Sequence, residues 1–380
     1  MRVAAILALA ALAAGCGGAA ATPERPALQR TLDALVTGPD QIAPGATAYV
    51  AGPQGVWTGA SGWADLAKQV RMTPDARMRL ESVSKLWTAT VVAKLAEEGR
   101  LRLDDTVERW LPGRFPYGDR ITVRQLLNHT SGMIDNNDLG NRPAYWLGQI
   151  QDAALRAEAV REATALQADP THIFPRLLEI RIAAALPLLS EPGTTWHYSN
   201  IGYMTAGLIA EKAGKAPLAD LYDRIIVRPL ELTSAGYYPA GPIAGRHPVG
   251  YSVHRGGVAI PATDHLGGTL QAEGGIVTDA KDEGRFLLGL VTGKIVSPAT
   301  LAELVGTTPA SGSYGLGTVV EPTCAGTAYT HNGGGASWAS SVAVSADGKR
   351  VAVVLLNGQR SYDPVSTPYY RALLTLFCAA

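Results

Sequence analysis

The sequence predicts an α+β protein in which an antiparallel sheet, built from both ends of the chain, packs against helices. Short strand-like runs occur at residues 46–62 and again after Tyr237. Between them, residues 145–189 are dominated by Ala, Leu, Arg, Glu and Gln, a composition typical of helices. The segment 81–100 is apolar on most faces, so we expect a buried helix there. This order of elements indicates a helical lobe inserted between two halves of a sheet lobe.

Local patterns define the individual elements. Residues 46–52 and 55–62 flank a turn that contains proline, which predicts a hairpin. Asp347-Gly348 between two apolar runs predicts a second hairpin near the C-terminus. Further helices are expected at residues 26–35, 201–212 and 365–377. The sheet lobe is assigned to residues 27–115 and 236–380, and the helical lobe to residues 116–235.

Composition excludes several classes of function. Lys plus Arg and Asp plus Glu are 33 each in the 380 residues, so nothing favours nucleic acid as a partner. The histidines have no metal-ligand spacing, and we expect no metal and no cofactor. No phosphate loop is present, and no Gly-x-Ser-x-Gly elbow indicates an α/β-hydrolase.

The N-terminus has the pattern of an export signal. One charge, Arg2, precedes an apolar run from Val3 to Ala14 that is too short to span a bilayer. Small residues before Cys16 favour a bacterial lipoprotein signal over residues 1–15, with lipid attached to Cys16 and a tether over 16–26. Plain secretion after cleavage near residue 20 is the alternative. Either way we expect an exported protein, periplasmic or on the cell surface, with a lipid anchor if Cys16 is modified.

Two cysteines remain beyond Cys16. In an exported protein Cys324 and Cys378 can form a disulfide. We favour the disulfide, with two buried free thiols as the alternative, because sequence does not supply the geometry.

The segment ESVSKLWTATVVAKLAEEGR, residues 81–100, places a serine one helical turn before a lysine. At this spacing Ser82 and Lys85 share a helix face, so the amine can approach the hydroxyl. Desolvation lowers the pKa of a lysine and allows it to act as a base for a serine nucleophile. The amide of Ser82 can hold an oxyanion at the first turn. An N-cap serine with a snorkelling lysine explains the same spacing.

A second candidate is EPGTTWHYSNIGY, residues 191–203. Tyr198 and Asn200 are two apart, so in an extended stretch they point the same way. A phenol near an ammonium is a candidate general acid or base, and the amide of Asn200 can orient a lysine or a substrate. A core tyrosine beside a helix-capping asparagine is the structural alternative.

The third candidate is YTHNGGGASW, residues 329–338. On a strand His331 and Gly333 share one face. Successive glycines in a strand suggest that another group approaches the backbone closely, and the amide of Gly334 is a candidate second oxyanion donor. A glycine bulge beside a surface histidine is the alternative.

In this order and setting, the three motifs resemble those of the serine β-lactamase and penicillin-binding protein superfamily. The likeness is closest to the branch of class C β-lactamases, D-alanyl-D-alanine carboxypeptidases and related esterases. In that branch Tyr-x-Asn replaces Ser-Asp-Asn, and His-x-Gly often replaces Lys-Thr-Gly. The resemblance extends from about Ala46 to the C-terminus and includes the segments GWAD, LRLDDTVERWLP, ITVRQLLNHTSGM, GGIVTDAKD and YGLG.

The resemblance implies a β-lactamase-like fold and an acyl-enzyme mechanism. It assigns the nucleophile to Ser82, its base to Lys85, the acid/base partner to Tyr198, the positioning of lysine and substrate to Asn200, the third motif to His331 and Gly333, and the oxyanion hole to the amides of Ser82 and Gly334. His129, in LLNHTSG, is expected to make structural hydrogen bonds.

Two departures from the family pattern bear on the substrate. Asn332 stands where the family has threonine, and Gly334 stands where a hydroxyl residue is frequent. Those hydroxyls help to bind a substrate carboxylate, so their absence favours an ester or a different amide. The span between Gly132 and Gly193 is also long for this branch.

The sequence therefore predicts an exported serine hydrolase that acts on a small molecule or peptide with an amide or ester bond. The alternatives are a β-lactamase and a penicillin-binding sensor or scaffold lipoprotein that does not turn over.

Overall fold

A computed structural model describes residues 25–37, 41–136, 143–169, 171–172, 175, 177–239, 242–254, 257–264, 271–360 and 368–380. The expected signal segment, the tether and Cys16 lie outside these residues, except for the last two tether positions. Within the described ranges, none of the helices combines the length and apolar character needed to cross a bilayer.

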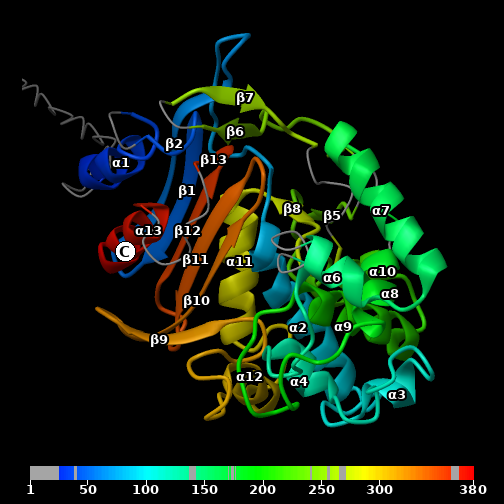
Figure 1. Cartoon of the computed structure of the whole chain (residues 1–380). Coiled ribbons are helices and arrows are strands. Elements are labelled where there is room, and N and C mark those ends of the chain that lie inside the picture. The colour runs from blue at the N-terminus through cyan, green and yellow to red at the C-terminus, as the bar shows by residue number, and fades with distance from the viewer. Residues whose placement is uncertain are drawn as a thin grey trace, which may run out of the picture.

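The centre of the fold is a seven-stranded sheet whose strand pairs are all antiparallel (Figure 1). Its strands, in spatial order, are β3 (Val70–Arg71), β2 (Gly55–Asp65), β1 (Gly45–Gly52), β12 (Val351–Leu356), β11 (Ala339–Ser345), β10 (Gly326–Gly334) and β9 (Val319–Thr323). Strand β1 pairs with β12, for example Ala48 opposite Val354, so the sheet joins both ends of the chain. The α+β class and both expected hairpins are confirmed.

Two small sheets adjoin the central one. The first contains β13 (Gly358–Arg360), β6 (Tyr251–Val253) and β7 (Ala259–Pro261). The second contains β4 (Met78–Arg79), β8 (Ile276–Thr278) and β5 (Gly236–Tyr237). The second sheet leads directly into the motif serine, because β4 ends three residues before Ser82.

Helices cover both faces of the central sheet (Figure 1). One face packs against α1 (Arg25–Asp33) and α13 (Pro368–Cys378), and their buried leucines form one apolar core with the sheet. The other face packs against α11 (Ala280–Val291). A disulfide joins Cys324, in the turn between β9 and β10, to Cys378 at the end of α13.

The remaining helices form a region beside the sheet (Figure 1). They are α2 (Ser84–Glu97), α3 (Val107–Trp110), α4 (Val123–Leu127), α6 (Pro143–Gln149), α7 (Ala153–Ala168), α8 (Leu178–Ala184), α9 (Asn200–Gly214), α10 (Leu218–Tyr222) with a π-turn at Asp223–Val227, and α12 (Pro298–Val305). Helix α2 packs against α9, which brings the first and second motifs together.

Helix α2 is buried on nearly all sides, as its apolar sequence predicts. Its Trp87 is fully buried, stacks on Phe286 with ring centroids 4.5 Å apart, and donates from Nε1 to Glu283 Oε2 at 3.0 Å. The same burial raises the pKa of Glu283 to about 8. The core thus holds an acidic group that favours its protonated form.

We expect this carboxyl to make the protein less stable as the pH rises. The pKa of a glutamate in the unfolded chain is about 4.3, so between that pH and about 8 the folded chain holds the extra proton at Glu283. The free energy of unfolding should therefore fall between pH 5 and pH 8, and Glu283→Gln should make that fall smaller. Urea unfolding at the two pH values measures it. Equal pH dependence in both proteins would show that Glu283 does not carry the effect.

Candidate active site

Ser82 and Lys85 lie where β4 passes into α2. Residues Glu81–Val83 form a 3₁₀ turn and α2 starts at Ser84, so the serine lies in the turn that leads into the helix. Lys85 Nζ lies 3.1 Å from Ser82 Oγ, and the lysine side chain is fully buried. The spacing therefore yields a buried amine in contact with the hydroxyl, whereas a snorkelling lysine would reach water.

The backbone before the serine is held in a strained conformation. Glu81 has a φ of 51°, a region that residues other than glycine rarely occupy. The residue is buried, with 5% of its surface exposed. Burial raises the pKa of its carboxyl to about 7. Strand β10 packs closely against this turn and helps to hold it in place. Gly333 leaves no room for a side chain there, since an added Cβ would lie 2.2 Å from Leu80 O and 3.0 Å from Ser82 N.

The second motif reaches the same point from the helical region. Tyr198 donates from its hydroxyl to Ser82 Oγ at 2.7 Å. Asn200 Oδ1 accepts from Lys85 Nζ at 2.6 Å. The cap of α9 is Ser199, whose Oγ accepts from Gly202 N at 3.1 Å, so the Asn200 side chain is available to bind the lysine.

His129 supports Tyr198 from behind. The imidazole is fully buried, its ring centroid lies 4.3 Å from that of Tyr198, and its Nδ1 accepts from Ser199 N at 3.1 Å. Burial holds the pKa of His129 well below its usual value, so the ring is neutral. The expected structural role of this histidine agrees with these contacts.

Burial lowers the pKa of Lys85, because the protein packed around the ammonium excludes water. The carboxyls of Glu273 and Asp135 oppose this change by favouring the charged form. Lys85 Nζ also donates to the backbone oxygen of Glu273 at 3.2 Å. The lysine is therefore held in one position and is easier to deprotonate than an exposed lysine.

The third motif lies along β10, at the edge next to Ser82. Gly333 faces Ser340 and Gly334 faces Ala339 on β11, while Gly335 N donates to Trp338 O at 3.1 Å. Hydrogen-bonded pairs alternate in an antiparallel ladder, so the Gly334 N–H points away from β11. Strand β9 pairs with β10 only as far as Thr330, so this N–H lies on the edge of β10 that β9 leaves unpaired.

His331 makes its contacts inside the protein. It is 6% exposed, Nε2 accepts from the Tyr314 hydroxyl at 2.9 Å, and Nδ1 donates to Asn332 O at 2.7 Å. Burial lowers the pKa of His331 to about 3. The neutral ring offers no positive charge to a substrate, and its contact with substrate stays a prediction. Asn332 Oδ1 accepts a hydrogen bond from Ser341.

We expect Gly333→Ala to disrupt the site, because the added Cβ would meet Leu80 O at 2.2 Å and Ser340 Oγ at 2.5 Å. Overpacking of this kind costs about 1–3 kcal/mol, and here it also displaces the turn that carries Ser82. Gly148→Ala is the control, since no atom lies within 4 Å of a Cβ there. Thermal unfolding and turnover measure the two effects. Unchanged turnover in Gly333→Ala would show that β10 does not support the turn.

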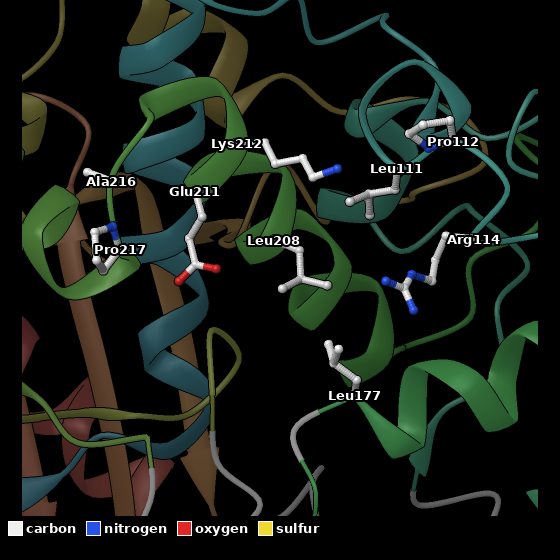
Figure 2. Close-up of a pocket in the computed structure, with 9 residues that line it drawn as sticks. All are labelled: Leu111, Pro112, Arg114, Leu177, Leu208, Glu211, Lys212, Ala216 and Pro217. Atoms are coloured by element: carbon white, nitrogen blue, oxygen red, sulfur yellow. The ribbon is translucent and has the colours of Figure 1, made fainter.

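A surface pocket of about 570 Å³ lies at the other end of α9 from Asn200 (Figure 2). Glu211 is eleven positions after Asn200, which is about 16 Å along a helix. The pocket is lined by Leu111, Pro112, Arg114, Leu177, Leu208, Glu211, Lys212, Ala216 and Pro217. It contains none of the three motifs. Across the described part of the chain, no three His, Cys, Asp or Glu side chains are grouped so that they could hold a metal ion.

Several contributors were not singled out from the sequence. The YGLG segment contains Tyr314 without marking it as a site residue, and no local pattern marks Asn136 or Glu273. Asn136 Oδ1 accepts from Asn200 Nδ2 at 3.0 Å, which extends the network around Lys85. Glu273 directly precedes Gly274, the first residue of the GGIVTDAKD segment that carries the family likeness. A carboxyl at the edge of such a segment was the available signal.

Comparisons with known proteins agree with this fold and site. A family profile described as Beta-lactamase matches residues 28–376. Penicillin-binding protein 4* of Bacillus subtilis is 30% identical over 179 residues, covering 47% of this chain and 34% of its own. Esterase EstB of Burkholderia gladioli is 31% identical over 188 residues, covering 48% and 44%. The chain thus spans less than half the length of these two relatives.

Solved structures extend the likeness over nearly the whole chain. A D-stereospecific amidohydrolase from Streptomyces sp. has a TM-score of 0.75 at 26% identity, covering 94% of this chain and 100% of that one. A D-amino acid amidase from Ochrobactrum anthropi SV3 has a TM-score of 0.73 at 22% identity, covering 93% and 96%, which shows a shared fold. Fold and site together define the β-lactamase and penicillin-binding protein class. The chain belongs to the Beta-lactamase family.

Proposed function

We propose that the protein is a serine hydrolase that cleaves an amide or ester through an acyl-enzyme at Ser82. One observation carries this proposal: Ser82 Oγ lies 3.1 Å from Lys85 Nζ and 2.7 Å from the Tyr198 hydroxyl. A hydroxyl held between a buried amine and a phenol is an activated nucleophile.

Acylation follows from these contacts. Neutral Lys85 takes the proton of Ser82 as Oγ bonds to the substrate carbonyl carbon. The carbonyl oxygen becomes an oxyanion, which the amides of Ser82 and Gly334 stabilise. Tyr198 donates a proton to the leaving nitrogen or oxygen as its bond to the carbonyl carbon breaks, and Lys85 returns a proton to Tyr198. The leaving group departs as an amine or alcohol, with the acyl group on Ser82.

Deacylation reverses the roles. Neutral Lys85 removes a proton from water, either directly or through the Tyr198 hydroxyl, which passes its own proton to Lys85, and the hydroxide bonds to the acyl carbon. The ester bond to Ser82 Oγ then breaks, and Oγ regains a proton from the same pair. The products are a carboxylic acid and free enzyme, and the proton count is restored.

The relatives support an amide or ester substrate. One solved structure of the same fold is a D-stereospecific amidohydrolase, and one relative of similar sequence is an esterase. The departures at Asn332 and Gly334 also favour substrates without the carboxylate that β-lactams carry. We therefore place amide or ester hydrolysis ahead of β-lactam hydrolysis.

Export and a lipid anchor at Cys16 are part of the same proposal. The disulfide between Cys324 and Cys378 supports it, because disulfides persist mainly in oxidising compartments. Fractionation of cells that express the full chain, with mass analysis of its N-terminal peptide, tests both points. A protein that stays in the cytoplasm with an unmodified Cys16 would contradict them.

Intact mass spectrometry tests the hydrolase proposal. Mixed with p-nitrophenyl acetate, the protein should gain one acetyl group and release p-nitrophenol in a burst, followed by steady turnover. Faster hydrolysis of nitrocefin than of the ester would instead favour a β-lactamase. A stable penicillin adduct with no ester turnover would favour a sensor. No adduct with any acylating probe would overturn the proposal.

A further inference from the structure

One tryptophan lies exposed beside the candidate active site. Trp196 is 43% exposed, whereas the other six tryptophans of the chain are buried or partly buried. An indole that faces water leaves apolar surface unburied, and contact with another apolar group would remove that surface from water. The mechanism above assigns no role to this side chain.

Trp196 lies directly against the tyrosine that contacts the nucleophile. Its ring centroid is 6.2 Å from that of Tyr198, and the Tyr198 hydroxyl donates to Ser82 Oγ at 2.7 Å. A tyrosine oxygen lies about 3 Å from the centre of its ring, so the indole centre is at most about 9 Å from that oxygen. A single side chain, Tyr198, therefore links the tryptophan to the nucleophile.

Packing holds the indole in one position. The backbone next to it is fixed, because His197 N donates to His129 O at 2.8 Å. The indole centroid lies 5.9 Å from that of the His129 ring and 6.2 Å from that of Tyr314. Both of these rings are buried, so the exposed part of Trp196 faces away from them. A rigid aromatic surface of this kind loses little conformational entropy when it binds a ligand.

The proposed mechanism decides which part of a substrate meets this surface. The carbonyl carbon carries three groups, and its oxygen points to the amides of Ser82 and Gly334. The leaving atom lies within hydrogen-bond reach of Tyr198, which protonates it. The acyl chain takes the third direction. The atoms beyond the leaving atom are therefore the ones on the Tyr198 side, next to Trp196.

A leaving group of modest size can reach the indole. With the leaving atom about 3 Å from the Tyr198 oxygen, the centre of a ring joined through one carbon lies about 4 Å further on. Aromatic rings attract each other at centroid separations of about 4.5–7 Å. These lengths together exceed the limit of about 9 Å between the Tyr198 oxygen and the indole centre, so such a ring can contact Trp196.

We propose that Trp196 binds the leaving group of the substrate, and that this leaving group is flat and apolar. The substrate class is an ester or amide of an aromatic or cyclic alcohol or amine, with at most a short link between the ring and the leaving atom. Stacking on the indole holds the leaving atom against the Tyr198 hydroxyl. This inference rests on the proposed hydrolase function and narrows its substrate class.

Methyl acetate, benzyl acetate and methyl phenylacetate test the proposal. The last two are isomers that carry the same ring on the leaving side and on the acyl side. Titration of the released acid should give a kcat/KM for benzyl acetate about tenfold or more above that for methyl acetate. Trp196→Ala should remove most of this preference, with a far smaller effect on methyl acetate and methyl phenylacetate.

Two further variants serve as controls. Trp196→Phe keeps an aromatic face and should retain part of the preference for benzyl acetate. Val160→Ala removes an apolar side chain that is 45% exposed on α7, at the outer edge of the helical region (Figure 1), and should change none of the three rates. Thermal unfolding checks that each variant is folded.

Equal losses for benzyl acetate and methyl acetate in Trp196→Ala would show that the indole only supports Tyr198, and would overturn the leaving-group site. A larger loss for methyl phenylacetate would place the acyl group at Trp196 and overturn it as well. A wild type with no preference for benzyl acetate would also overturn it, and acetylation of Ser82 by p-nitrophenyl acetate would then leave the hydrolase proposal in place. Absence of any adduct at Ser82 would overturn both.

Discussion

Ser82→Ala is expected to lower kcat/KM for ester or amide hydrolysis by about 10⁴-fold or more, because no other group can form the acyl-enzyme. The variant should remain folded. Lys85 keeps its bonds to Asn200 and to the backbone of Glu273, and alanine fits at the start of a helix. Stopped-flow measurement of p-nitrophenol release should show neither burst nor turnover.

The control for this variant is Ser61→Ala. Ser61 lies on β2, away from β10, and its hydroxyl donates to Asp33 of α1. It should retain wild-type turnover. Substrate binding gives a second readout, since Ser82→Ala should still bind an uncleaved amide. If Ser82→Ala retained the burst, the acyl group would be on another residue, and the assignment of the nucleophile would be wrong.

The sequence predicted the local elements well. The two hairpins and α2 follow from short-range patterns, namely alternation, turn residues and a continuous apolar segment. It also predicted which motifs would meet, because the resemblance to a known family fixes how distant segments are arranged. The structure then brings Ser82, Lys85, Tyr198 and Asn200 within hydrogen-bond distance.

Other features depend on packing between distant segments and leave no local pattern. The bond from Tyr314 to His331 joins a loop to β10, and nothing in either segment alone indicates it. Likewise, Glu179 and Glu273 are 94 residues apart in sequence, and neither is unusual in its own segment. The electrostatic effect of Glu273 on Glu179 arises only when folding buries both carboxyls.

The left-handed backbone at Glu81 and His129 is a further case. Asparagine, aspartate and glycine are the residues that usually adopt this conformation, so no local pattern predicts it at a glutamate. Tertiary contacts hold it there, in particular the close approach of Gly333 to Leu80. The strain lies immediately before the nucleophile, at the position where the turn directs Ser82 toward Lys85.

Lys85→Met is expected to lower kcat by about 10²–10⁴-fold, the contribution of a general base, while Ser82 remains available to reactive fluorophosphonates. Burial lowers the pKa of Lys85, and only its neutral form accepts the proton of Ser82. Wild-type activity should therefore rise with pH as Lys85 loses its proton, and this rise should disappear in the variant. The profile of kcat/KM against pH measures it.

Lys94→Met is the matched control, because Lys94 lies on the same helix but pairs with Glu97 at the partly exposed end. It should leave the pH profile unchanged. Methionine at position 85 places no charge in the buried site, so thermal unfolding should show a folded protein. If kcat/KM of Lys85→Met still rose with pH as in wild type, the group that titrates would not be Lys85. Tyr198 would then be the candidate base, since its hydroxyl lies 2.7 Å from Ser82 Oγ.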